Sequence, residues 1–277
     1  MTNLANLFNF IESNRPEYRV PLKFKLIYDP ESITEDDLNV DGNLDLNGPK
    51  ITSLPDNLTV KGVLDLHGTK ITTLPDNLTV KGGLVLRSTP ITSLPNNFKV
   101  SGSLDLNGTK ITSLPDNLTV GGGLVLRNTP ITSLPDNLIV GGDLDLDGTK
   151  ITSLPDNLTV GGGLGLNDSK ITTLPDNLTV GDGLYLRDTK IASLPDNLIV
   201  GGGFDLGNTP ITSLPNNLKV GGCLNLSNTK ITSLPDNLTV GGYLGLENTP
   251  LSKQYTESEI RKMIQDKGGN IGGVIYI

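Results

Sequence analysis

The sequence predicts a mainly β solenoid in which short coils stack and form one parallel sheet of about 11 short strands. We expect an extended convex side and small capping elements at both ends, with a parallel β-helix as the alternative. The first observation is that a decapeptide of the type ITSLPDNLTV begins at Ile51 and recurs every 20 residues, up to residue 231. The second is that the 33 glycines and 18 prolines of the 277 residues fall largely within this period. The third is an aromatic content of only 4 %, which leaves Leu, Ile and Val to form a core that only stacked repeats can bury.

The first half of each repeat predicts a strand. We number the 20 slots of a repeat from Asp41, so that slots 4 and 6 are apolar, as in Leu44 and Leu46. This alternation points both leucines to one side of an extended strand and slots 3, 5 and 7 to the other. Stacked strands about 4.8 Å apart would give a sheet roughly 50 Å long.

The second half of each repeat predicts an extended return. Slots 11, 14, 18 and 20 are apolar, slot 15 is Pro in all ten full repeats, and slot 17 is Asn in all ten. Proline fixes φ and removes a donor, which disfavours a regular helix here. Slot 2 is Gly in ten of 11 repeats, with Asp182 as the exception, and we expect a bend with positive φ at this slot.

The regions outside the repeats predict caps, which a solenoid needs to cover its end coils. We predict an N-terminal cap over 1–40, the solenoid over 41–250 and a helix–strand cap over 251–277. The segment NLFNFIE indicates a short amphipathic helix, whereas the alternation of Leu22, Phe24 and Leu26 indicates an edge strand. A capping box from Thr256 to Glu259 predicts a helix over about 257–267, ended by two glycines, before a last strand in IGGVIYI.

The repeat resembles a known family. Leu104, Leu106, Thr109 and Ile111, followed by LPDN, resemble the short leucine-rich repeat, most closely the LPX-type arrays of bacterial secreted effectors and of uncharacterised bacterial and phage proteins. The resemblance covers residues 41–250 and implies a leucine-rich repeat solenoid. An effector subfamily appends a large ubiquitin-ligase domain, but 27 residues follow this array, so we do not expect that activity.

The chain departs from the family at slot 9. The family carries Asn there, whose amide bonds neighbouring coils, whereas this chain has Thr in nine of 11 repeats. The asparagines of slot 17 could supply a ladder instead. The slot 9 hydroxyls could point inward to the backbone, or they could join the threonines of slot 12 in an ice-binding face.

Charge and cysteine content exclude several classes of partner. The net charge of −8 and a pI of about 4.7 disfavour nucleic acid and anionic membranes. A single cysteine, Cys223, excludes an internal disulfide framework and suits a reducing compartment. The N-terminal residues suggest neither a signal peptide nor a membrane span, so we expect a cytoplasmic monomer or weak oligomer without cofactors. Delivery to a host cell by another route stays open.

The residues capable of catalysis are too far apart for an enzyme. His67 and Cys223 are the only residues of their types, and their separation of 156 residues corresponds to 7.8 coils, or roughly 37 Å. A Cys–His pair needs contact at about 3 Å. Asp143, Asp145 and Asp147 share one strand face, and alternate residues of a strand lie about 6.6–7 Å apart, which is too wide for all three to bind one Ca²⁺ directly. We therefore predict no enzyme and no metal site, and a solvated acidic patch at these three residues.

The outward strand slots predict the functional surface, because they differ between repeats while the decapeptide scarcely varies. We expect a non-enzymatic scaffold that binds a protein through the concave sheet face, and a basic partner would gain association rate there. Tyr and Arg are frequent hot-spot residues, although the arginines could instead pair laterally with aspartates. Neutral drift and a structural or virion role are the alternatives. The candidate residues are Asp65, Val85, Arg87, Asp105, Val125, Arg127, Asp145, Tyr185, Arg187, Asp205 and Tyr243.

Overall fold

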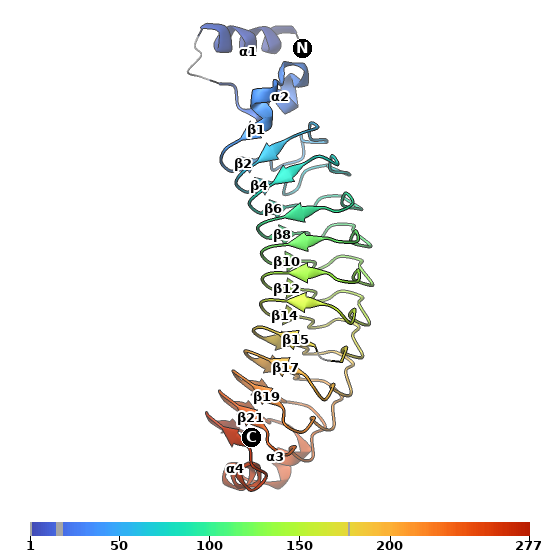
Figure 1. Ribbon diagram of the computed structural model, residues 1–277, viewed down its shortest axis with the longest axis vertical. Coiled ribbons are helices and arrows are strands. Elements are labelled where there is room, and N and C mark those ends of the chain that lie inside the picture. Colours follow the sequence, from blue (N-terminus) through green and yellow to red (C-terminus); the bar gives the residue numbers. More distant parts are fainter. Residues whose placement is uncertain (1, 15–18, 177) are drawn as a thin grey trace.

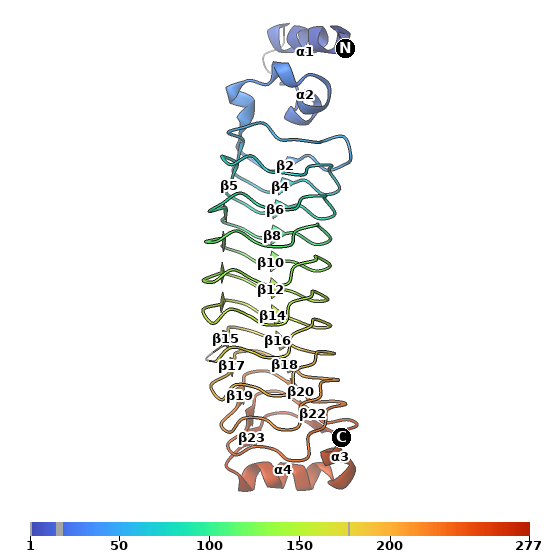
Figure 2. The same cartoon turned by 90° about the vertical axis from the view of Figure 1, so that its right-hand side faces the viewer.

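The computed structural model describes residues 2–14, 19–176 and 178–277. Figure 1 shows a long, gently curved rod of stacked coils with helices at both ends, and Figure 2 shows the regular spacing of the coils from the side. The predicted parallel solenoid is confirmed. None of the helices of these residues is both long and apolar enough to cross a membrane.

Each coil contributes two strands, which form two parallel sheets of 12 strands each. Sheet A consists of β1 (Asn39–Val40), β3 (Thr59–Val60), β5 (Thr79–Val80), β7 (Lys99–Val100), β9 (Thr119–Val120), β11 (Ile139–Val140), β13 (Thr159–Val160), β15 (Thr179–Val180), β17 (Ile199–Val200), β19 (Lys219–Val220), β21 (Thr239–Val240) and β23 (Asn270–Ile271). Sheet B consists of β2 (Leu44–Asp45), β4 (Leu64–Asp65), β6 (Leu84–Val85), β8 (Leu104–Asp105), β10 (Leu124–Val125), β12 (Leu144–Asp145), β14 (Leu164–Gly165), β16 (Leu184–Tyr185), β18 (Phe204–Asp205), β20 (Leu224–Asn225), β22 (Leu244–Gly245) and β24 (Ile275–Tyr276).

The prediction of a single sheet of about 11 strands is therefore wrong. The end of the decapeptide, at slots 19 and 20, forms sheet A, because extended β-branched residues of successive coils lie in register there, as in Thr59 opposite Thr79. Each coil contributes one strand to each of two parallel sheets, and the fold shares this feature with the β-helix alternative.

Every coil repeats the same register, so that identical slots stack on one another. Leu124 lies opposite Leu144, and Val125 lies opposite Asp145. The side chains of slots 4 and 6 are buried along nearly the whole array, together with those of slots 11, 18 and 20. The predicted alternation is confirmed, and slots 3, 5 and 7 point outward from sheet B.

Positive φ occurs at slot 8 and not at slot 2, which corrects the expectation for the slot 2 glycines. Slot 8 has positive φ in every repeat, and it carries Gly, Asn, Asp or Ser, mostly residues that tolerate this region. Glycine at slot 2 is explained by close approach instead. A Cβ on Gly102 would lie 2.7 Å from the carbonyl carbon of Gly82 in the preceding coil.

The slot 9 threonines are buried, and the hydroxyls of all but Thr69 bond to the backbone. Thr149, for example, donates from Oγ1 to the carbonyl oxygen of Leu146 at 2.7 Å, and seven other threonines make the equivalent bond. These threonines are buried, so the slot 9 row cannot contact ice. One of the two threonine rows of the ice-binding hypothesis is thereby removed.

Thr149→Val is expected to lower the free energy of unfolding by about 1 kcal/mol, because it removes a buried hydrogen bond at nearly constant shape. Thr69→Val is the matched control. Among the described residues, the buried Oγ1 of Thr69 has no hydrogen-bond partner, so its removal should be neutral or stabilising. Denaturant unfolding of both variants checks this, and an equal loss in both would contradict the role given to the hydroxyl.

The slot 17 asparagines form a partial ladder on the surface. Asn77 donates from Nδ2 to Oδ1 of Asn57 at 2.6 Å, and Asn237 bonds to Asn217 at 2.9 Å. Among the described residues, six asparagines of this slot also have positive φ. The predicted ladder is thus present in part and exposed, and backbone conformation is a second reason for Asn at this slot.

Before β1, the regular elements in the described residues of the N-terminal flank are helical, namely α1 (Thr2–Asn14), α2 (Leu22–Tyr28) and the 3₁₀ turns η1 (Pro30–Ser32) and η2 (Glu35–Leu38). The edge strand predicted from Leu22, Phe24 and Leu26 is wrong. The buried side chains of α2 are Leu22 and Lys25, a helical interval, whereas Phe24 is exposed. Lys25 forms ion pairs with Glu12 at 2.8 Å and with Asp37 at 2.9 Å.

The C-terminal flank closes the stack. After α3 (Pro250–Gln254), which the sequence did not indicate, α4 (Glu257–Asp266) begins at the predicted capping box of Thr256 and Glu259. Gly268, at a φ of 77°, ends it. β23 and β24 then complete a last coil that pairs with β21 and β22, so the predicted last strand is joined by a second one.

Candidate interaction face

We define the sheet-B face as the outward side chains at slots 3, 5 and 7 of the strands of sheet B. All of the candidate residues lie on this one face. Slot 5 holds Asp65, Val85, Asp105, Val125, Asp145, Tyr185 and Asp205, slot 7 holds Arg87, Arg127 and Arg187, and slot 3 holds Tyr243. Tyr185 is 42 % exposed and Tyr243 is 40 % exposed.

Two of the three arginines are engaged within the face, as the lateral-pairing alternative predicted. Arg87 donates from Nε and Nη2 to Oδ2 of Asp105 in the next coil, at 3.1 and 2.6 Å. Arg127 donates from Nε to Oδ2 of Asp145 in the next coil, and from Nη2 to Oδ2 of Asp147 at 3.1 Å. Arg187 is different, because its ion pair is with Asp188 of its own coil, at 3.4 Å.

The slot 5 aspartates have a structural role that the sequence analysis missed. Each accepts the backbone N–H two residues later. Oδ1 of Asp65 accepts from His67 at 2.8 Å, and Oδ1 of Asp205 accepts from Gly207 at 2.8 Å. An Asp or Asn at a strand end commonly makes this bond, so part of the acidic character of the face serves the fold.

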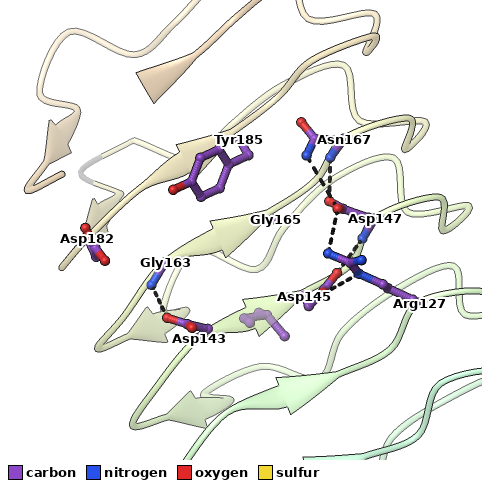
Figure 3. A pocket seen from close by; sticks show the side chains of 10 residues that line it. Arg127, Asp143, Asp145, Asp147, Gly163, Gly165, Asn167, Asp182 and Tyr185 are labelled. Atoms are coloured by element: carbon purple, nitrogen blue, oxygen red, sulfur yellow. Dashed lines mark hydrogen bonds and ion pairs between the residues drawn. The ribbon is translucent and has the colours of Figure 1, made fainter. Parts of the chain in front are cut away.

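A hollow opens in the face where slot 5 is glycine. In register, Gly165 of β14 lies between Asp145 of β12 and Tyr185 of β16, so the missing side chain leaves a gap between two larger ones. The cavity has a volume of about 360 Å³. We call it the Gly165 hollow. Its lining residues are Arg127, Asp143, Leu144, Asp145, Asp147, Gly163, Gly165, Asn167, Asp182 and Tyr185 (Figure 3).

The carboxylates around the Gly165 hollow are unequally compensated. Asp147 is held by Arg127 and also accepts the amide N–H of Asn167 at 2.8 Å. Burial raises the pKa of Asp145, and the charge of Asp147 adds to this, against the hydrogen bonds from the Asp147 amide and Arg127. On the opposite side of the hollow, Asp143 accepts the amide N–H of Gly163 at 2.7 Å. Neither Asp143 nor Asp182 forms an ion pair with any described residue.

A second hollow of about 460 Å³ lies towards the C-terminal end of the face. Tyr243 and Tyr276 meet edge to face there, with their ring centroids 5.4 Å apart. Burial raises the pKa of the Tyr243 hydroxyl, with further contributions from Cys223 and nearby acidic groups. Arg187, Asn225, Ser227 and Glu247 complete the lining. Sequence reasoning missed Tyr276, although it occupies the slot 5 position of the last coil.

The residues considered for catalysis do not form a site. His67 is exposed at slot 7 of an early coil, and Cys223 is half-buried at slot 3 of a late one. The parts of the chain that the structure describes contain no group of three or more His, Cys, Asp or Glu side chains that could hold a metal ion.

Comparison with known proteins gives neighbours among solved structures only. No protein-family description and no curated protein sequence matches the chain. The leucine-rich repeat protein LIC12759 of Leptospira interrogans is 20 % identical over 98 % of this chain and 99 % of its own, with a TM-score of 0.39. YopM, a leucine-rich effector protein from Yersinia pestis, is 17 % identical over 99 % of this chain and 94 % of its own, with a TM-score of 0.40. The leucine-rich repeat architecture of the chain is evident from its own 20-residue coils.

Proposed function

We propose that this leucine-rich repeat solenoid is a non-enzymatic scaffold that binds a partner protein through its sheet-B face. The observation that carries the proposal is the gathering, on one face, of exposed tyrosines, two hollows, and an arginine, Arg187, whose guanidinium forms its ion pair within its own coil. Tyrosine and arginine are the side chains that most often dominate binding energy at protein interfaces.

The outward face of sheet A supports the choice by contrast. Its slot 19 carries threonine in six repeats, at residues 59, 79, 119, 159, 179 and 239. The exposed isoleucines Ile139 and Ile199 occupy the same slot in two others. The slot 19 row also carries Lys99 and Lys219, and a hollow of about 630 Å³ opens beside Thr159 and Thr179. It is nevertheless more uniform than the sheet-B face, and it has no aromatic side chain, a type that is enriched at the core of protein interfaces.

The coil register supports the mechanism. Strands of sheet B place slot 5 side chains at a fixed spacing of about 4.8 Å, on a backbone bonded to the coils on both sides. A surface that is already ordered loses little conformational entropy when a partner docks. The acidic side chains of the face would favour a partner with a basic surface and increase its association rate.

The test compares what co-purifies with the wild-type chain and with a Tyr185→Ala, Arg187→Ala double variant from cells of the source organism. We expect a partner that the wild type retains and the double variant binds at least tenfold more weakly, because truncation of hot-spot residues costs about 2 kcal/mol or more. Ile199→Thr is the matched control, since it changes the outward face of sheet A to a residue that this slot already carries at Thr179.

Two results would contradict the proposal. One is a partner that binds the double variant as tightly as the wild type. The other is a partner that is lost with Ile199→Thr, which would move the interaction to sheet A. Thermal unfolding of each variant shows whether the fold is intact.

A further inference from the structure

We infer that the Gly165 hollow is the subsite that receives one arginine side chain of the partner protein. The inference rests on the proposed function and adds the chemistry of one contact to it. The hollow is built by sequence, because slot 5 carries Asp145 and Tyr185 in the flanking coils and only Gly165 between them. Its floor is the backbone of β14, and it is open to solvent (Figure 3).

The charge of the lining identifies a cationic occupant. Four carboxylates and one guanidinium line the hollow. Arg127 occupies one side, where it serves Asp145 and Asp147, while Asp143 and Asp182 lie across the hollow from it (Figure 3). A guest cation would therefore find uncompensated carboxylates on the side away from Arg127.

The size and spacing of the groups favour an organic cation over a metal ion. Alternate residues of a strand lie about 6.6–7 Å apart along the backbone, and the Asp145 and Asp147 carboxylates are already bonded to Arg127, whereas a Ca²⁺ ion needs several free oxygens at about 2.3–2.6 Å. No metal-binding cluster occurs in the described ranges. A volume of about 360 Å³ is at the lower end of the range for pockets that take organic groups.

The aromatic ring beside the hollow favours arginine over the other cationic side chains. The ring of Tyr185 borders the hollow, and its hydroxyl end points towards Asp182 (Figure 3). A planar guanidinium stacks on an aromatic ring and presents five N–H donors, so it can bond to separate carboxylates at once. A lysine ammonium is a compact point charge that cannot do both as well. The raised pKa of Asp145 is consistent with a cationic ligand. Burial and the charge of Asp147 raise this pKa, so Arg127 only partly balances the negative charge of Asp145.

The test is an NMR titration of the ¹⁵N-labelled full chain with three blocked tripeptides, Ala-Arg-Ala, Ala-Lys-Ala and Ala-Ala-Ala. We expect the arginine peptide to shift the amide signals of Gly163, Gly165 and Tyr185, with an affinity at least tenfold above that of the other two. Gly165→Val should weaken this binding at least tenfold, since it fills the hollow with the residue that slot 5 carries at Val85 and Val125. Gly245→Val makes the same change at the same slot away from the hollow and should leave binding unchanged.

Asp182→Asn is a second variant that removes charge with little change of shape, and it should weaken the arginine peptide several-fold even if Gly165→Val does not fold. The inference is overturned if the lysine or alanine peptide binds equally well, if the shifts lie elsewhere, or if the variants bind like the wild type. Ca²⁺ alone producing the same shifts more tightly than the peptide would also overturn it.

The two proposals fail separately. If no peptide shifts the amide signals but the Tyr185→Ala, Arg187→Ala variant loses the partner, the arginine subsite is contradicted and the binding face is still supported. If arginine binds at the hollow but the partner binds the double variant as tightly as the wild type, the proposed function of the face is contradicted.

Discussion

Replacing Lys25 by alanine is expected to destabilise the N-terminal cap by about 3–5 kcal/mol, the usual consequence of breaking a buried ion pair. Lys25 is 1 % exposed, and its ammonium lies between Glu12 of α1 and Asp37 of η2. Its removal leaves Asp37 buried without its cation. Hydrogen exchange of the α2 amides measures the effect. Lys23→Ala is the control on the same helix, because Lys23 pairs with Asp45 at 3.4 Å on the surface. This substitution should destabilise the cap by less than about 1 kcal/mol.

The same cluster sets a pH window for the cap. Burial alone would lower the pKa of Lys25, but the hydrogen bonds and charges of Glu12 and Asp37 outweigh it and raise that pKa. Burial alone would raise the pKa of Asp37, but its bonds to Thr34 and Lys25 outweigh this and lower that pKa. The contribution of Asp37 is therefore present above about pH 4 and is lost as the pH falls further, whereas that of Lys25 is lost as the pH rises beyond about 10.5. In Lys25→Ala the alkaline loss should be absent, and its persistence would contradict this assignment.

Leu144→Ala is expected to lower the free energy of unfolding by about 2–5 kcal/mol, because Leu144 is fully buried between the coils on either side. Stability in a solenoid is carried by contacts between neighbouring coils, so a central cavity weakens two interfaces at once. Leu44→Ala, at the same slot of the first coil, should have a smaller effect, since Leu44 is only partly buried. Denaturant unfolding compares the two, and equal losses would argue against the stacked-coil account.

The architecture was predictable because the same pattern of apolar, Gly, Pro and Asn positions recurs in ten repeats. The alternation of slots 4 and 6 fixes which side of the strand is buried, and Leu124 and Leu144 show that outcome directly. Sheet A was missed because its strands, such as Thr159–Val160, closely follow the proline of slot 15, and the sequence analysis assigned that whole segment to an extended return. It becomes visible only when coils stack and identical slots pair.

Local backbone features were harder to predict than the stack. Glycine at slot 2 and glycine at slot 8 look alike in sequence, but one avoids a clash between coils and the other has positive φ. The recurrence of Asn128 and Asp168 at slot 8 was the available signal, since both residues tolerate that conformation. In α2, the alternation of Leu22, Phe24 and Leu26 was misleading because the helix buries Leu22 and Lys25, and Lys25 is not an apolar residue.

The candidate site was predictable as a face but not as a set of partners. The sequence placed Arg87 and Arg127 outward, and the structure shows that cross-coil pairing with Asp105 and Asp145 engages them. The Gly165 hollow was missed because an absent side chain gives no signal until its neighbours, Asp145 and Tyr185, are known to flank it.

The central claim, that the sheet-B face is the binding surface, is tested most directly by side-chain footprinting with hydroxyl radicals on the complex with the co-purified partner. Oxidation of Tyr185 and Tyr243 should fall strongly in the complex, because both are exposed on the sheet-B face of the free chain. Ile139 and Ile199, exposed on the outward face of sheet A, should be oxidised as in the free chain. Protection of the two isoleucines with unchanged tyrosines would contradict the account.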